Sequence, residues 1–156
     1  MRFFIFAMAL IMTTTVHAKC YNSAEFEAEQ GLRIHSELMV IALNCHKSTH
    51  TSGNLYIQYK DFTRRHQGLI GQYEQTLKNY YSRAGIKNAE LKINDLRTQL
   101  ANKISNDAAR MKPNVFCRAY GSRITQALGM DQAKLRRWAS TPFAGHPVSR
   151  PVCTRG

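Results

Sequence analysis

Acidic residues are scarce in this sequence, which has 10 Asp and Glu against 22 Lys and Arg. The resulting formal net charge of +12 favours anionic partners and speeds their encounter with the protein. Outside the cytoplasm, such partners include phospholipid headgroups, lipid phosphates and acidic glycans. The alternative interpretation is that the charge only keeps the protein in solution. We expect no specific nucleic-acid binding.

Long apolar runs are also lacking. No stretch after the N-terminal segment approaches the roughly 20 apolar residues that a membrane span requires, so we expect no transmembrane segment in the mature chain. The sequence contains no G-x-S-x-G, S-x-x-K, P-loop, G-x-G-x-x-G or C-x-x-C motif. We therefore assign no catalytic, cofactor-binding or metal-binding residues. This favours a non-enzymatic protein, although missing motifs do not exclude an enzyme.

Residues 1–18 have the three parts of a secretory signal peptide that is cleaved on export. Arg2 is followed by the uncharged apolar run Phe3–Met12, and Val16-His17-Ala18 is a small-residue cleavage pattern. Cleavage there leaves residues 19–156. A lipoprotein signal needs a small residue before its cysteine, and Lys19 before Cys20 does not fit. The sequence therefore predicts an exported protein of the periplasm or secreted space.

Apolar residues recur three or four positions apart through most of the remaining chain, which predicts an all-α fold. The expected helices occupy residues 23–44, 55–81, 89–111 and 114–128, with a short extra helix before residue 139. Asn22 and Glu25 are expected to form a capping box. Gly68 and Gly71 lie inside the second helix, where each costs about 1 kcal/mol relative to Ala when exposed. The alternative is that they let a neighbouring helix come close.

Four helices with short connections suggest an antiparallel four-helix bundle in up-down-up-down order. Residues 19–138 form one helical domain in this interpretation. Residues 139–156 contain Pro142, Pro147 and Pro151 and are expected to form an irregular tail. We see no second domain.

Four cysteines in an exported chain indicate two disulfides. In the bundle, the end of the first helix lies beside the start of the fourth, which places Cys45 near Cys117. Cys20 and the tail residue Cys153 both lie at the opposite end. The expected pairs are therefore Cys45 with Cys117 and Cys20 with Cys153, an assignment that depends on the bundle. Bridged cysteines leave no thiolate for catalysis.

The alternative functions are a metal-handling protein or a hydrolase. Cys45-His46-x-x-x-His50 has histidines four residues apart, and His35 is a further candidate ligand. The simpler interpretation is that the loop histidines lie beside a structural cysteine. Paired carboxylates could hydrolyse a glycosidic bond. The candidates are Glu25, Glu27, Glu29 and Glu37 of the first helix, for which capping and solvation are the simpler explanation.

Basic side chains supply the candidate contacts to an anion, because arginine and lysine bind phosphate and carboxylate. The candidates are Lys60, Arg64, Arg65, Arg118, Arg123, Arg136 and Arg137. Arg136-Arg137-Trp138 resembles an interfacial anchor. The favoured alternative is that Trp138 packs against the base of the bundle while the arginines face water.

We thus expect an exported, non-enzymatic helical protein that binds a protein partner or an anionic envelope component through its basic C-terminal half. A further alternative is an accessory subunit of an envelope complex. That function requires an exposed apolar patch, for which Tyr80, Tyr81 and Phe143 are candidates.

Overall fold

The computed structural model describes residues 20–48, 53–143 and 145–153. It confirms the all-α prediction, because the only β feature in this part of the chain is an isolated bridge between Tyr21 and Val152. The helices are α1 (Ser23–Cys45), α2 (Leu55–Arg83), α3 (Ala89–Arg110), α4 (Pro113–Tyr120), α5 (Ser122–Leu128) and α6 (Gln132–Ala139). No helix of the described chain is long and apolar enough to cross a membrane. The expected signal peptide, residues 1–18, lies outside the described residues.

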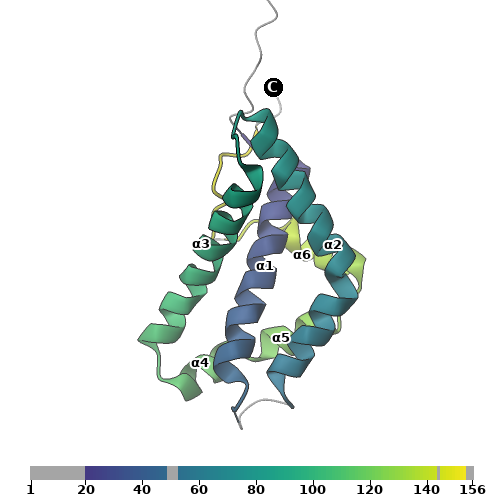
Figure 1. The fold of residues 1–156 in the computed structure, drawn as a ribbon. Coiled ribbons are helices and arrows are strands. Elements are labelled where there is room, and N and C mark those ends of the chain that lie inside the picture. The colour runs from purple at the N-terminus through teal and green to yellow at the C-terminus, as the bar shows by residue number, and fades with distance from the viewer. Residues whose placement is uncertain (1–19, 49–52, 144, 154–156) are drawn as a thin grey trace, which may run out of the picture.

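Helix α1 is the centre of the molecule and contacts every other helix. Figure 1 shows α2 and α3 on either side of α1, each antiparallel to the helix before it. The short helices α4 and α5 lie at the lower end of this view, and α6 follows beside α1. The tail then returns to the upper end, where the N–H of Tyr21 donates to the Pro151 carbonyl at 2.8 Å.

The structure does not confirm the up-down-up-down four-helix bundle. The expected fourth helix, 114–128, is divided into α4 and α5 at Gly121. At this break the N–H of Ile124 bonds to the Gly121 carbonyl, a tighter i→i+3 bond than the α-helical pattern. Eight residues of helix span only about 12 Å, so α4 is far shorter than α1 and lies across its end (Figure 1).

Polar caps explain where the long helices begin. The expected capping box is present: the N–H of Glu25 donates to Asn22 Oδ1 at 2.9 Å, and the N–H of Asn22 donates to Glu25 Oε2 at 2.8 Å. Asn54 and Asn88 cap α2 and α3 in the same way through their side-chain oxygens. Each cap provides acceptors for amide groups that a helix start leaves unpaired.

A glycine does allow a close helix contact, but it is Gly31 of α1. A Cβ at this position would overlap the ring of Tyr73 on α2. For Gly68 and Gly71 the alternative of close helix packing is wrong, because nothing lies within 4 Å of a Cβ built at either position. Both lie on the exposed face of α2, where no neighbouring helix packs.

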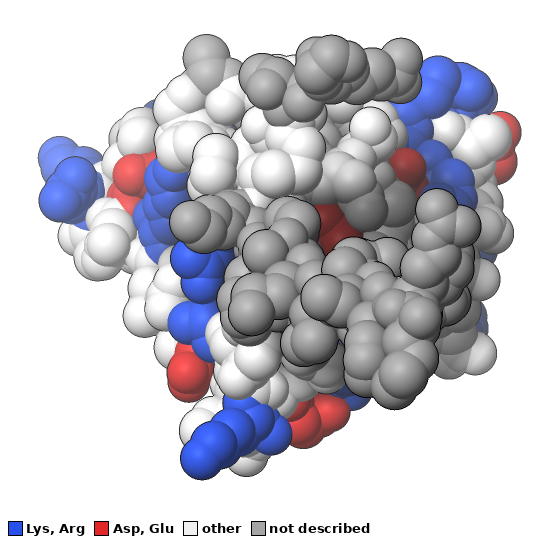
Figure 2. Space-filling model, turned by 90° about the horizontal axis from the view of Figure 1, so that it is seen from above, with Lys and Arg blue, Asp and Glu red and all other residues white. Residues whose placement is uncertain are grey.

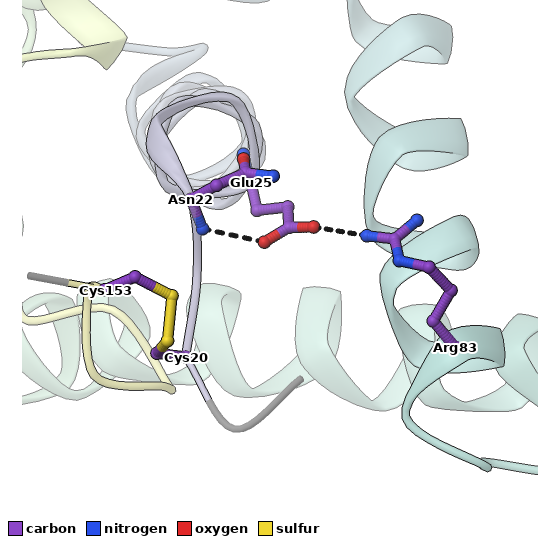
Figure 3. Close-up of a disulfide and its surroundings, with 5 residues drawn as sticks. All are labelled: Cys20, Asn22, Glu25, Arg83 and Cys153. Atoms are coloured by element: carbon purple, nitrogen blue, oxygen red, sulfur yellow. Dashed lines mark hydrogen bonds and ion pairs between the residues drawn. A yellow bond between two sulfur atoms is a disulfide. The ribbon is translucent and has the colours of Figure 1, made fainter. Parts of the chain in front are cut away.

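Two disulfides join segments that are distant in sequence, and they connect the cysteines in the expected pairs. Cys45–Cys117 links the end of α1 to α4, with a Cα–Cα distance of 5.5 Å. Cys20–Cys153 links the residues before α1 to the tail, with a Cα–Cα distance of 5.1 Å (Figure 3). The predicted disulfide pairs required only that the chain after α3 start beside the end of α1. This arrangement is present although the helices do not form a regular bundle.

Candidate anion-binding surface

Two of the seven candidate anion-binding residues turn inward. Arg136 of α6 donates to Glu27 Oε1 at 2.7 Å and to Gln72 Oε1 at 2.9 Å. Arg123 of α5 forms an ion pair with Glu37. Both side chains are less than half exposed, and each already binds a carboxylate of α1. They therefore hold the fold together and are not free for an external anion.

Three of the four carboxylates of α1 are buried, which corrects the expectation that solvation explains them. Glu25, Glu29 and Glu37 are only 3%, 2% and 5% exposed. Glu25 lies between the backbone of Asn22 and the side chain of Arg83, with which it forms an ion pair (Figure 3). A buried carboxylate requires such partners because an unpaired charge is costly to remove from water.

Arg33, Glu37 and Arg123 form a charge cluster in which the side chains of Arg33 and Glu37 are both buried. Arg33 Nη1 donates to Glu37 Oε2 at 2.8 Å, its Nε donates to Gln30 Oε1 at 2.6 Å, and its guanidinium carbon lies 4.6 Å from the centre of the Phe143 ring. Burial, with a smaller contribution from Arg123, lowers the pKa of Arg33 to about 10. Arg33 therefore remains a buried cation at neutral pH.

The tail is fastened to α1 through Glu29. The Ser149 N–H donates to Glu29 Oε1 at 2.6 Å, and the Ser149 hydroxyl donates to Oε2 at 2.5 Å. The hydroxyl of Tyr21 lies 3.3 Å from both Ser149 Oγ and Tyr81 Oη. Burial and the nearby Glu29 raise the pKa of Tyr21 above its usual range, so this cluster stays neutral apart from the carboxylate. The polar groups of this cluster form hydrogen bonds with one another, so the cluster has a structural role.

The other five candidates stay at the surface. Lys60, Arg64 and Arg65 are exposed on α2, Arg118 on α4 and Arg137 on α6. Arg64 pairs with Asp61 at 2.8 Å, which satisfies its charge in part. The guanidinium of Arg65 donates to the Leu128 carbonyl. Lys60, Arg118 and Arg137 have no carboxylate partner within the described chain.

Trp138 is half-buried against the hydrophobic core, and the paired Arg136 lies two residues before it. The packing of Trp138 agrees with the favoured interpretation, but the expectation that both arginines face water is wrong for Arg136, which pairs with Glu27, while Arg137 is exposed. The expected apolar patch at Tyr80, Tyr81 and Phe143 is wrong. Both tyrosines are buried, and Phe143 is half-buried beneath Arg33.

At the lower end in Figure 1, α1 and α3 end and α2 and α4 begin. We call residues 43–48, 53–60 and 110–118 the distal end. The apolar side chains exposed there are Leu43, Tyr56, Ile57, Met111 and Val115. The basic side chains exposed there are Lys47, Lys60, Arg110, Lys112 and Arg118. None of these cations has a carboxylate partner among the described residues.

The opposite end, next to the Cys20–Cys153 disulfide, also carries exposed cations, of which Lys87 and Arg150 have no carboxylate partner among the described residues. Figure 2 shows that the Lys and Arg side chains visible there are spread around the edge, with Asp and Glu side chains next to most of them. A cavity of about 630 Å³ near the start of α1 is lined by Phe26, Glu27, Pro142 and Val152 among others. Its one carboxylate, Glu27, is already bonded to Arg136 and Tyr73.

The candidate histidine ligands do not come together. His35 is buried in α1, and its Nε2 lies 3.0 Å from the Tyr59 hydroxyl. Burial lowers the pKa of His35 to about 4. His46 is exposed eleven residues later, about 16 Å along the helix axis. His50 lies outside the described residues, and the described part of the chain contains no group of three His, Cys, Asp or Glu that could hold a metal.

Comparison with known proteins gives no match: no family model, no curated protein sequence and no solved structure is similar to this chain.

Proposed function

We propose that this is an exported, non-enzymatic protein of the periplasm or secreted space that binds an anionic component of its surroundings. Residues 1–18 act as the cleaved signal peptide, and residues 19–156 form the mature protein. Two disulfides, with no free cysteine in the described chain, support a protein made for an oxidising compartment.

The observation that supports this proposal is which charged side chains form ion pairs and which do not. Ion pairs occupy Glu25, Glu27, Glu37, Asp61, Glu74 and Glu90. Several of these carboxylates lie inside the molecule, where they contribute little to the field outside. The cations of the distal end are exposed and lack such partners. The surface field is therefore positive where an anion can reach it.

The location of this surface differs from the sequence-based expectation of a basic C-terminal half. Arg123 and Arg136 belong to that half but neutralise α1. Lys47 and Lys60 belong to the first half of the chain and lie at the distal end. The binding surface is thus a spatial end of the molecule and draws on both halves of the sequence.

Binding of the oxidised mature protein to an immobilised sulfated polysaccharide and to anionic lipid vesicles tests the proposal. We expect binding to both at low ionic strength and a steep loss as salt rises, because exposed charges are screened beyond about 8 Å at physiological salt. Binding to neither probe at low salt would contradict the proposal.

An accessory subunit of an envelope complex is the second candidate. The apolar side chains of the distal end favour it, because exposed apolar patches also mark protein interfaces. Isolation of the protein from envelope extracts, with and without high salt, separates the two functions. A stoichiometric protein partner that survives high salt supports the subunit function.

A further inference from the structure

We infer that the distal end docks onto an anionic phospholipid bilayer. This inference rests on the proposed function and specifies its partner. It follows from the combination of exposed aliphatic and unpaired basic side chains at one end of the molecule.

The apolar residues of the distal end come from different elements that meet there. Leu43 lies in the last turn of α1, Ile57 in the first turn of α2 and Val115 in the first turn of α4. Leu43 and Ile57 are 52% and 57% exposed. The Cys45–Cys117 disulfide joins α1 to α4 at this end and holds two of these elements together. The disulfide therefore fixes the elements that carry Leu43 and Val115 relative to each other.

Cations lie close in sequence to these apolar side chains. Lys47 follows α1, Lys60 is one turn after Tyr56, and Lys112 and Arg118 flank Val115. The Lys60 ammonium lies 5.8 Å from the centre of the Tyr56 ring. Such a mixture of basic and apolar side chains is typical of surfaces that rest in the headgroup region of a membrane.

Two acidic residues, Asp61 and Asp107, lie next to the distal end, and none lies within it. Asp61 of α2 pairs with Arg64, which leaves Lys60 as the uncompensated cation of that turn. Asp107 of α3 lies one turn before the distal end, and the Tyr120 hydroxyl donates to it at 3.4 Å. The face presented by the distal end itself is basic.

A bilayer fits this surface better than a purely polar polyanion does. Leu43, Ile57 and Val115 have no polar group with which to bind a sugar or a phosphate, so they contribute only by leaving water. A bilayer offers both an anionic surface for the cations and an apolar layer beneath it for the aliphatic side chains. A polysaccharide would use the cations and leave the aliphatic side chains in water.

Flotation of the oxidised mature protein with phosphatidylglycerol–phosphatidylethanolamine vesicles tests the inference. The apolar test variant is Leu43→Ser/Ile57→Ser. Its control is Leu91→Ser, because Leu91 is equally exposed, at 56%, but lies at the start of α3 at the opposite end. We expect the test variant to bind these vesicles at least about tenfold more weakly and the control to bind like the wild type.

The charge test variant is Lys112→Ser/Arg118→Ser, and Lys87→Ser/Arg150→Ser removes the same charges at the opposite end. Each basic side chain at an anionic membrane strengthens binding about fivefold, so the distal pair should weaken it about 25-fold and the control much less. The Leu43→Ser/Ile57→Ser variant should still bind a soluble sulfated polysaccharide normally. Circular dichroism establishes that each variant is folded.

Several outcomes would overturn the inference while leaving the proposed function intact. One is vesicle binding that Leu43→Ser/Ile57→Ser does not change. Another is an equal loss from the distal and control charge variants. A third is that the distal substitutions abolish association with a protein or a second copy and leave vesicle binding unchanged. A wild-type protein that binds no anionic probe at all would instead refute the proposed function.

Discussion

Replacement of Glu37 by Gln tests whether the buried charges of α1 hold the fold together. The substitution preserves the shape of the side chain and removes the negative charge between Arg33 and Arg123. The Arg33 side chain is only 8% exposed and cannot turn to water without leaving the core. The Arg123 side chain is 40% exposed and can regain hydration.

The expected loss of stability follows from this difference. Removing one partner of a buried ion pair typically costs about 3–5 kcal/mol, because the other charge stays buried without compensation. Since only Arg33 is trapped, we expect Glu37→Gln to lower the free energy of unfolding by about 3 kcal/mol. Burial also holds the pKa of Arg33 at about 10, too high for the side chain to escape the cost by losing its proton at neutral pH.

Urea denaturation followed by circular dichroism, with both disulfides intact, measures this loss. Glu90→Gln is the matched control: it removes the partner of Lys78 from a pair in which the Glu90 side chain is 63% exposed. An exposed pair contributes at most about 1 kcal/mol. Adding Arg33→Met to Glu37→Gln should recover part of the loss, because the trapped cation is then absent. Equal costs for Glu37→Gln and Glu90→Gln would refute the reasoning.

Three further predictions concern stability. Gly31→Ala should destabilise the protein by about 2 kcal/mol through overlap with a tyrosine ring, whereas Gly71→Ala on the open face should stabilise it by up to about 1 kcal/mol in thermal or urea unfolding. Replacing Cys45 and Cys117 by Ala should cost about 4 kcal/mol, since the bridge closes a 72-residue separation in the unfolded chain. The lowered pKa of His35 means that the unfolded chain binds a proton at higher pH than the folded one. The stabilisation is therefore complete above the ordinary pKa of histidine, and the free energy of unfolding should fall by about 1.5 kcal/mol between pH 6.5 and pH 5. In urea titrations, His35→Gln should remove most of this pH dependence of the free energy of unfolding.

The long helices could be predicted from the sequence because each has its own local signals. Apolar residues three and four apart place α2 and α3 within a few residues of their ends. Asn22 and Glu25 locate the start of α1 through side-chain chemistry that requires no tertiary contact. The same periodicity continues through α4 and α5, so nothing local showed that the chain turns at Gly121.

The burial of α1 was harder to predict from the sequence, because its charged residues were expected to face water. Its surroundings depend on contacts with all the other helices, which local patterns do not specify. One signal was present: Val40, Ile41 and Ala42 are consecutive and all buried, so apolar residues occupy more than one face of this helix. That pattern is typical of a helix enclosed by others.

The enclosure of α1 also explains where the positive charge of the surface lies. Four of the chain's carboxylates lie on this helix, and arginines from α2, α5 and α6 reach inward to bind three of them. Arg123 and Arg136 thereby contribute less positive charge to the surface, whereas the Arg83 side chain stays 55% exposed. The cations of the distal end lie beyond Glu37, the last of these carboxylates, so none of the α1 carboxylates pairs with them. The distal end carries unpaired cations together with exposed apolar side chains, and its comparison with the opposite end, where Lys87, Arg150 and Leu91 are also exposed, distinguishes a docking face from a charge that only keeps the protein in solution.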